Sequence, residues 1–243
     1  MSYPLELKDV VKRFGGLTAT NHMSFEVNDG ESLGLIGPNG AGKTTIFSLI
    51  MGEHRQTSGE ILCNGEDISS LPTYARIGRG VCRTYQIPRP FAEMDVLENI
   101  RLGLMPNSLW QMLTRNPDRY KEIELALSVG FGEDDLHRHP AELSMGDLRK
   151  LELARTLATD PSIMLLDEVF AGLTAGEIAQ IAELINKKRK EGMTLIIVSH
   201  DLRSLEPLID RAIAMNHGSI VAEGSFAKVM ADPDVRASYL GGE

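Results

Sequence analysis

One segment near the start of the chain has the residue types and spacing of a phosphate-binding loop. It matches the pattern G-x-x-x-x-G-K-[ST] at every fixed position and consists of Gly37, Pro38, Asn39, Gly40, Ala41, Gly42, Lys43 and Thr44. Glycines allow successive backbone N–H groups to curl around phosphate oxygens, the lysine reaches the β- and γ-phosphates, and the threonine hydroxyl can hold Mg²⁺. The loop therefore predicts that the chain binds a nucleoside triphosphate with Mg²⁺.

The residues on either side of this loop have the pattern that such a site requires. Residues 31–36 are typical of a short strand, and residues 45–51 are typical of a helix whose N-terminus adds positive charge beside the phosphates. A chance glycine-rich turn is the alternative, and the strand–loop–helix setting disfavours it. The loop alone does not indicate what the nucleotide drives.

Two adjacent carboxylates follow the apolar run at residues 162–166. Such a run is typical of a strand buried on both faces of a parallel sheet, and open α/β sheets bind ligands at the C-terminal ends of their strands. Asp167 is placed to bind the Mg²⁺ shell, and Glu168 can polarise the water that attacks the γ-phosphate. The alternative is an acidic strand-to-loop turn, and the phosphate-binding loop disfavours it.

Another apolar run, residues 193–198, ends at Ser199, His200 and Asp201. A lone histidine at a strand end is structural more often than functional. Together with the loop and the carboxylates, His200 becomes a candidate sensor of the γ-phosphate.

A second candidate anion site lies between these regions. Residues 143–147 read Leu-Ser-Met-Gly-Asp, and residues 148–155 have helical apolar spacing. Small residues at a helix N-terminus can bind an anion. Judged alone, the segment is more simply interpreted as an ordinary serine cap.

The remaining patterns predict the elements that position these residues. Residues 5–11 and 23–27 alternate apolar and polar side chains, as antiparallel strands do. Residues 59–65 predict a further strand pair around an Asn-Gly turn. Residues 94–104 and 120–129 have helical spacing.

We therefore expect one α/β domain over residues 1–243 with a P-loop nucleotide-hydrolase core. Its mainly parallel sheet would be joined by an N-terminal antiparallel β subdomain and an inserted α-helical subdomain. The predicted core comprises residues 1–86 and 161–243, and the helical subdomain comprises residues 87–160. A chain of 243 residues is long enough for such a domain.

Composition excludes several classes of protein. A net charge of −9 disfavours non-specific attraction to nucleic acid or anionic lipid. Cys63 and Cys82 lack paired metal-ligand spacing, which indicates a reducing compartment and disfavours a zinc site. No apolar run approaches the about 20 residues that span a bilayer, and the first residues lack the features of an export signal. We expect a cytoplasmic protein that does not cross a membrane.

These motifs in this order resemble the ATP-binding subunit of ATP-binding cassette (ABC) transporters, and the resemblance covers essentially the whole chain. It implies that residues 37–44 form the Walker A loop with Thr45 also near phosphate, and that residues 163–167 form Walker B. Asp167 would then bind MgATP, and Glu168 would be the catalytic base.

The resemblance also assigns two residues that their own surroundings do not. Gln86, after residues 81–85, is similar to the loop glutamine that contacts Mg²⁺ or water and senses the membrane partner. Judged alone it is a polar loop residue. Phe14 is similar to the aromatic residue that stacks on adenine, although an aromatic near a strand is more often part of a core.

In this family the signature segment contacts the ATP of the opposite subunit, so that two cassettes close around two nucleotides. The resemblance implies that Ser144 and Gly146 donate to the γ-phosphate across that interface, and that residues 171–174 link the two sites. The expected partners are a second cassette, which makes a homodimer or a heterodimer, and two transmembrane permease subunits. An external solute-binding protein would be an indirect partner.

Residues 83–91 and 94–100 resemble the corresponding segments of importers of branched-chain amino acids and related small polar solutes. Three segments near the C-terminus, residues 220–225, 232–233 and 239–241, are similar too. Such importers pair two different cassettes.

Four positions depart from the family pattern. The signature has Met145 and Asp147 where glycine and glutamine are usual, which places a carboxylate near the partner's γ-phosphate. Alternatively, Asp147 lies favourably in the first turn of its helix. Val169 replaces the usual proline after the catalytic glutamate, and Thr174 replaces the acid or amide of the linking loop.

We therefore expect an ATPase subunit of an importer, peripheral on the inner face of the cell membrane and with no nucleic acid partner. The apolar residues expected to receive a membrane subunit are Ile87, Pro88, Pro90, Phe91 and Met94, with a role in the core as the alternative. Two other functions remain open. One is the cassette of an exporter of lipid or lipopolysaccharide, and the other is a nucleotide-gated regulatory subunit that hydrolyses ATP weakly.

Overall fold

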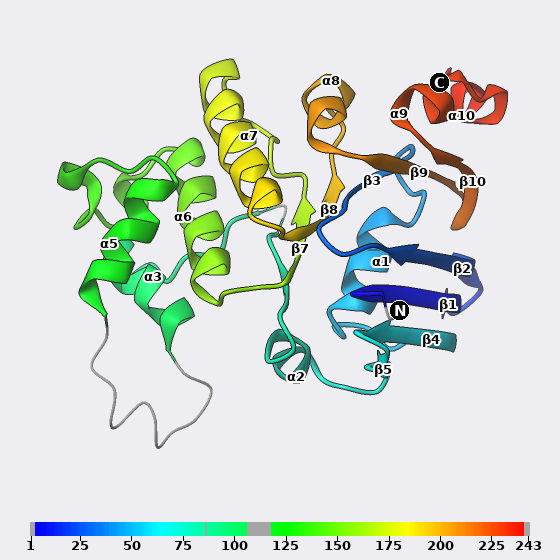
Figure 1. Cartoon of the computed structure of the whole chain (residues 1–243), viewed down its shortest axis with the longest axis horizontal. Helices are drawn as coiled ribbons and strands as arrows, with labels where there is room; N and C mark the ends of the chain where they lie inside the picture. Colours follow the sequence, from blue (N-terminus) through cyan, green and yellow to red (C-terminus); the bar gives the residue numbers. More distant parts are fainter. Residues whose placement is uncertain (1–2, 86, 106–117, 241–243) are drawn as a thin grey trace.

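Two sheets organise the residues that the computed structural model describes, which are 3–85, 87–105 and 118–240 (Figure 1). The larger sheet has the order β10-β9-β3-β8-β7-β6. Its strands are β3 (Ser32–Ile36), β6 (Val81–Arg83), β7 (Ile163–Asp167), β8 (Thr194–Val198), β9 (Arg211–Asn216) and β10 (Ser219–Gly224). All neighbouring strands are parallel except β9 and β10. Every residue of β3, β7 and β8 is buried, which explains their continuous apolar runs.

The smaller sheet is antiparallel and has the order β2-β1-β4-β5. Its strands are β1 (Leu5–Phe14), β2 (Leu17–Val27), β4 (Ser58–Cys63) and β5 (Glu66–Asp67). Asn64 and Gly65 both have positive φ, 50° and 82°, as the predicted hairpin turn requires. The expected antiparallel β subdomain and mainly parallel sheet are therefore both confirmed.

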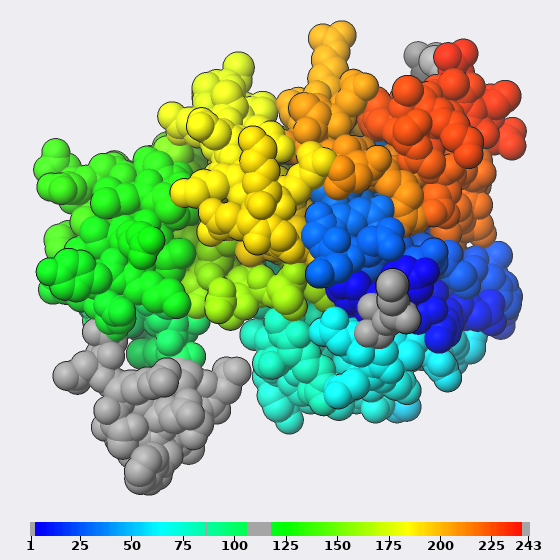
Figure 2. Space-filling view, viewed as in Figure 1, coloured from blue at the N-terminus to red at the C-terminus, as the bar shows by residue number. Residues whose placement is uncertain are grey.

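Helices fall into two groups in Figure 1. Near the sheets lie α1 (Lys43–Ile50), α2 (Thr73–Ile77), α7 (Ala175–Lys190), α8 (Leu202–Leu205), α9 (Phe226–Ala231) and α10 (Pro233–Leu240). At the far end, α3 (Val96–Leu104), α5 (Arg119–Ser128) and α6 (Met145–Ala158) pack against one another. In Figure 2, α5 (green) and β1 (dark blue) lie on opposite sides of α7 (yellow). The expected subdomain boundaries at residues 86/87 and 160/161 remain a prediction.

Two hydrophobic clusters cover the two faces of the large sheet. Alternate residues of β7 contribute to each: Met164 and Leu166 belong to the cluster with α3, α5 and α6, and Ile163 and Leu165 belong to the cluster with the small sheet and α1. Buried strand residues must alternate in this way, because successive side chains point to opposite faces. Packing on both faces of the sheet therefore fixes the position of the C-terminal end of β7, where Asp167 lies.

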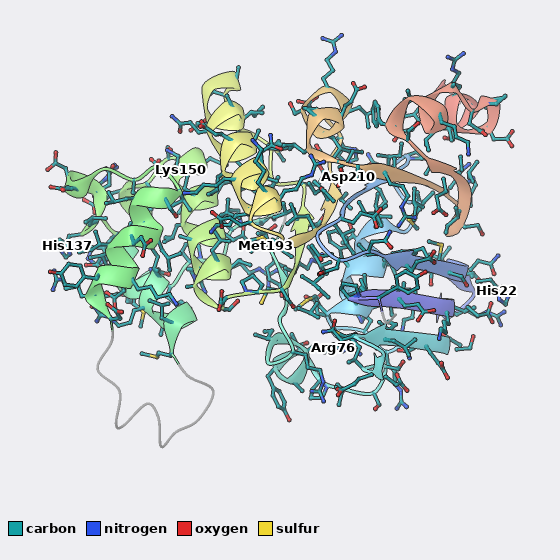
Figure 3. All side chains as sticks on the ribbon, viewed as in Figure 1. His22, Arg76, His137, Lys150, Met193 and Asp210 are labelled. Atoms are coloured by element: carbon teal, nitrogen blue, oxygen red, sulfur yellow. The ribbon has the colours of Figure 1, made fainter. Side chains whose placement is uncertain are left out.

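The helix that follows the phosphate-binding loop is anchored at its C-terminal end. Arg76 of α2, labelled in Figure 3, is 1% exposed and donates to the carbonyls of Leu49 and Ile50 at 2.6 and 2.8 Å. The last carbonyls of a helix lack the usual i+4 partner, and the arginine satisfies that of Ile50 and adds to the bond that Leu49 accepts from the Gly52 N–H at 3.1 Å. Among the described residues, no helix is both long and apolar enough to cross a membrane.

Candidate active site

The phosphate-binding loop leaves β3 in the middle of the large sheet, where backbone from other strands comes close. A side chain at Gly37 (φ 149°) would place its Cβ 2.2 Å from the Met215 carbonyl oxygen, and one at Gly42 (φ 103°) would place it 2.5 Å from the Ala19 carbonyl oxygen. Gly42 is also the N-cap of α1, so the helix begins at Lys43 rather than at the expected residue 45. The glycines are thus required by close approach as well as by phosphate geometry.

Lys43 is buried inside the curve of the loop. Its Nζ donates to the carbonyl oxygens of Gly37 at 2.6 Å and of Pro38 at 2.9 Å. Burial lowers the pKa of Lys43, and the nearby carboxylates of Glu168 and Asp167 partly oppose that shift. The ammonium is therefore held by weak acceptors that phosphate oxygens can replace, and a phosphate would favour its charged form.

A cavity of about 480 Å³ opens above this loop. It brings together most of the predicted site, and its walls include Phe14, Asn39, Gly40, Ala41, Gly42, Lys43, Thr44, Thr45, Glu168 and His200. Phe14 is 42% exposed, so it is not a core residue. His54 and Phe14 form a T-shaped pair with ring centroids 5.2 Å apart, and Lys12 Nζ lies over the Phe14 ring, 4.7 Å from its centroid, so an aromatic and a cationic group meet at the cavity rim.

Asp167 lies at the end of β7 and is 1% exposed. Its Oδ2 accepts from the Arg83 guanidinium at 2.6 Å, and its backbone N–H donates to Thr84 Oγ1 at 3.2 Å. Its Oδ1 is buried with no hydrogen-bond partner in the described part of the chain. An orphaned carboxylate oxygen of this kind fits the shell of a hard cation. The third predicted metal ligand, Gln86, lies outside the described residues.

Glu168 follows in a left-handed conformation with φ 51°, which costs about 1–3 kcal/mol for a residue with a side chain. Its N–H donates to the Val198 carbonyl at 2.9 Å, which ties it to the neighbouring strand. Its Oε2 accepts from the His200 backbone N–H at 3.1 Å, and its Oε1 lies 3.2 Å from His200 Nε2. The structure therefore pairs the candidate base with the candidate sensor, at the edge of the phosphate cavity.

The signature segment lies elsewhere. Ser144 is the N-cap of α6, which begins at Met145, ahead of the clear apolar spacing at residues 148–155. The Ser144 Oγ accepts from the Asp147 N–H at 3.1 Å and donates to Asp147 Oδ2 at 2.8 Å, while Lys150 donates to Asp147 Oδ1 at 3.2 Å. The serine cap and the first-turn position of Asp147 are both present. Neither Ser144 nor Gly146 lines the phosphate cavity of its own chain.

The other two departures from the family pattern have structural places. Val169 is buried in the core at 2% exposure. Thr174 forms a capping box with Glu177 at the start of α7. Gly146 packs against that same turn, because a Cβ there would lie 1.8 Å from Glu177 Oε1. Thr174 therefore stabilises the turn on which the signature rests.

Sequence reasoning missed two contributors to the site. Arg83 holds Asp167, and His217, with φ 46°, lines the phosphate cavity from the turn between β9 and β10. Neither residue belongs to a local pattern. Arg83 could have been suspected only from a charge inside a short apolar segment before Gln86.

Comparisons with known protein sequences agree with this geometry. A family profile described as "ABC transporter" matches residues 20–171, and one described as "Branched-chain amino acid ATP-binding cassette transporter" matches residues 219–243. The chain is 35% identical to the high-affinity branched-chain amino acid transport ATP-binding protein LivG of Escherichia coli (strain K12), over 99% of both chains. It is 34% identical to the protein BraF of Pseudomonas aeruginosa, with the same coverage.

Solved structures of cassettes have the same fold. A nucleotide-free ATP-binding cassette from an ABC transporter matches with a TM-score of 0.88 at 29% identity, over 98% of this chain and 99% of that one. A bacterial ABC transporter cassette solved as a dimer matches with a TM-score of 0.79 at 24% identity, over 91% and 98%. The chain therefore belongs to the ABC transporter family, as an ATP-binding cassette of the branched-chain amino acid type, and it is an ATPase that energises transport.

Proposed function

We propose that this chain is the MgATP-hydrolysing subunit of an importer for branched-chain amino acids or a related small polar solute. Relatives that match it over their full length are named for branched-chain amino acid transport. The observation that carries the catalytic part is the single cavity in which Lys43, Glu168 and His200 meet. The solute itself would not touch this subunit.

The residues present fit a bound Mg²⁺. Asp167 offers the unpartnered buried Oδ1, Thr44 is an exposed residue at the start of α1 on the cavity wall, and Gln86 is the remaining expected ligand. When bound, Mg²⁺ neutralises charge on the β- and γ-phosphate oxygens. The loop N–H groups and Lys43 would hold the phosphates, and Phe14 would stack on adenine.

In hydrolysis, Glu168 would orient the attacking water and accept its proton. The pairing with His200 keeps the carboxylate at the cavity before nucleotide binds, and His200 would turn to the γ-phosphate when it arrives. The backbone strain at Glu168 is consistent with a position fixed for chemistry rather than for stability.

A second cassette would complete the site. Ser144 and Gly146 do not line this chain's own cavity, yet Ser144 is exposed at a helix N-terminus, where an anion is favoured. Facing another cassette, they would donate to the γ-phosphate held there. The dimeric cassette of the same fold gives a precedent for such pairing.

Permease subunits would dock near the segment that follows Gln86. Ile87 and Phe91 are 71% and 49% exposed, so they are surface rather than core residues. Pro88, Pro90 and Met94 are half-buried beside them. Phe91 also lines a neighbouring cavity of about 510 Å³ that can receive a short helix of the membrane subunit. The chain would thus lie in the cytoplasm against the inner face of the membrane.

The test is ATP-driven uptake by proteoliposomes that contain this chain with its co-purifying cassette and permease subunits. We expect uptake of labelled leucine from a loaded solute-binding protein, and its loss when the chain carries Glu168→Gln. Export of a labelled lipid would reject the importer in favour of an exporter. ATP hydrolysis that does not respond to any solute-binding protein would also reject it.

A further inference from the structure

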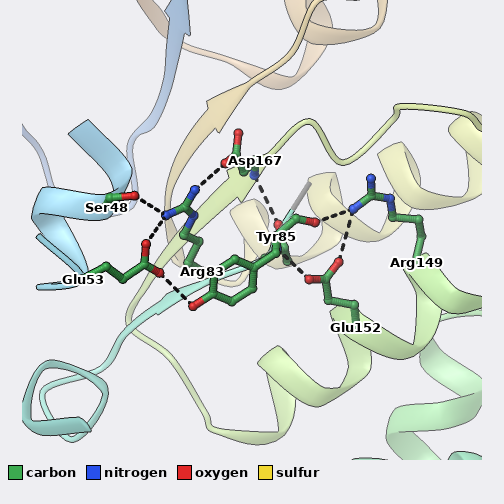
Figure 4. Close-up of polar contacts among 8 residues, drawn as sticks. Ser48, Glu53, Arg83, Tyr85, Arg149, Glu152 and Asp167 are labelled. Carbon is green, nitrogen blue, oxygen red and sulfur yellow. Dashed lines mark hydrogen bonds and ion pairs between the residues drawn. The ribbon is translucent and has the colours of Figure 1, made fainter. Parts of the chain in front are cut away.

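A buried arginine lies directly behind the carboxylate assigned to Mg²⁺. Arg83 ends β6, and its side chain is 4% exposed. The guanidinium donates to Asp167 Oδ2 at 2.6 Å, to Glu53 Oε2 at 2.9 Å and to Ser48 Oγ at 3.1 Å (Figure 4). It therefore joins the end of β7 to α1 and to the turn after α1.

The two oxygens of Asp167 consequently have different surroundings. Oδ2 takes the charge-assisted bond from Arg83, whereas Oδ1 is buried and unpartnered among the residues described. Thr84 accepts from the Asp167 backbone N–H, so the segment around Arg83 holds main chain and side chain together. A carboxylate held by one oxygen presents the other in a defined direction, because rotation would break the bond to Arg83.

Arg83 is itself oriented from several sides. The rings of Phe47 and Tyr85 lie 5.6 and 5.1 Å from its guanidinium carbon. Glu53 bridges Arg83 and Tyr85, because its Oε1 accepts from the Tyr85 hydroxyl at 2.8 Å while its Oε2 accepts from Arg83. The direction of the guanidinium is therefore set without any ligand.

The same segment is tied to α6, the helix that carries the signature at its start. The Tyr85 N–H donates to Glu152 Oε1 at 2.6 Å, and Arg149 donates to the Tyr85 carbonyl and to Glu152 Oε2 (Figure 4). A shift of α6 relative to the large sheet would pull on Tyr85, and through Glu53 on Arg83.

We propose that Arg83 is a positioning residue for the metal site: it holds Oδ2 of Asp167 so that Oδ1 faces the Mg²⁺ of the bound nucleotide, in a manner that depends on α6. This inference rests on the proposed role of Asp167 in the metal shell. Removing partners that orient a metal ligand typically lowers metal affinity by about 10–100-fold.

The test uses Mn²⁺ as a spectroscopic substitute for Mg²⁺. Electron paramagnetic resonance measures the affinity of Mn²⁺ for the full chain saturated with a non-hydrolysable ATP analogue, and a separate titration measures analogue affinity without metal. For Arg83→Met we expect Mn²⁺ affinity to fall by about 10–100-fold. Metal-free analogue affinity should change by no more than about twofold, because Arg83 does not line the phosphate cavity.

Arg76→Met is the matched control. Arg76 is also a buried arginine, but it donates to backbone carbonyls: those of Leu49 and Ile50 at the far end of α1, and those of Ser69 and Leu71 before α2. It should lower the melting temperature and leave Mn²⁺ affinity unchanged. An equal Mn²⁺ affinity in the Arg83 and Arg76 variants would overturn the proposal.

Three further variants keep the result interpretable. Arg83→Lys retains charge and much of the bulk, so it should fold and show a smaller loss of Mn²⁺ affinity than Arg83→Met; unaltered affinity in both Arg83 variants would overturn the positioning role. Glu152→Gln should weaken Mn²⁺ binding severalfold, and no change there would overturn the dependence on α6. If Asp167→Asn leaves Mn²⁺ affinity intact, the assignment of Asp167 to the metal site is wrong. If Asp167→Asn weakens Mn²⁺ binding but the Arg83 variants do not, only the positioning role of Arg83 is wrong.

Discussion

The chain positions the two parts of the site differently. One part is the Walker half, which comprises the phosphate-binding loop, Asp167, Glu168 and His200, and the other is the signature, residues 143–147. Asp167 and Glu168 are buried at a strand end and bonded to residues at or just after the ends of the two neighbouring strands, β6 and β8. Ser144 and Met145 are exposed, and the side chain of Ser144 bonds only within the first turn of its own helix among the contacts described. One half is built by tertiary packing, and the other is a helix end that presents itself to solvent.

This difference has a functional meaning. A half-site that must bind phosphate and metal before anything else arrives benefits from groups fixed in advance. A half-site that acts on another chain's nucleotide must stay accessible until that chain closes on it. The hydrogen bonds that Asp147 accepts from Ser144 and Lys150 then fix the conformation of the signature while it has no phosphate to bind.

The largest effect should come from breaking the Walker half. In the assembled transporter, Glu168→Gln should lower the rate of ATP hydrolysis by roughly 10²- to 10⁴-fold while MgATP still binds, because it removes the proton acceptor and keeps the shape. Phosphate release measures the rate, and a fluorescent nucleotide measures binding. Wild-type turnover in this variant would exclude Glu168 as the base.

A smaller effect should come from breaking the signature. Ser144→Ala removes a hydroxyl expected to donate to the partner's γ-phosphate, and a hydrogen bond to a charged group is worth about 1.5–3 kcal/mol, or roughly 10- to 150-fold in association. Nucleotide-driven pairing of cassettes should weaken accordingly, whereas binding of nucleotide to the isolated chain should not change. Analytical ultracentrifugation measures the pairing.

Ser225→Ala is the control for Ser144→Ala. Ser225 caps α9, so its replacement costs a comparable 0.5–2 kcal/mol of stability, on the order expected for any serine cap, without touching the signature. Equal pairing in the two variants would mean that Ser144 is only a cap.

The smallest effect should come from removing one charge in the signature. Asp147→Gln removes a carboxylate that would face the partner's γ-phosphate and frees the Ser144 hydroxyl. Exposed charge pairs are worth about 0.2–1 kcal/mol, so pairing should strengthen by up to about fivefold. Glu183→Gln removes the same charge from an exposed position on α7 and should change nothing. A sedimentation experiment in which both variants equal the parent would discard the repulsion.

The sequence predicts the Walker half better than its supports. The loop, the Asp167-Glu168 pair and His200 each follow an apolar run, so short-range patterns place them at strand ends of one sheet. Arg83 and Asp167 are 84 positions apart, and no local pattern indicates that they pair. The site residues are thus predictable where the chemistry constrains them, and their partners are not.

The same distinction applies to the fold. The strands predicted at residues 5–11, 23–27 and 59–65 are antiparallel and half-buried, with clear alternation or turn signals. β9 and β10 were not predicted from pattern, and β6 has only the three residues Val81–Arg83. β6 and β9 pair in parallel with strands distant in the sequence, which short windows do not contain, whereas β10 pairs antiparallel with β9 across the short turn at His217 and Gly218, a local signal that the sequence analysis missed. The start of α1 lies at Lys43 rather than at the expected residue 45, because apolar spacing does not mark the first turn of a helix, whereas the serine cap of α6 agrees with the sequence interpretation.

We expect this chain to bind MgATP alone but to need the signature of a second cassette to hydrolyse it. The most direct measurement is ATP turnover per chain against chain concentration, with and without the second cassette, beside nucleotide binding on the same samples. We predict one nucleotide bound per chain at every concentration, and turnover per chain that rises with concentration or on addition of the second cassette. Full turnover by a chain that sediments as a monomer, independent of concentration, would contradict the account.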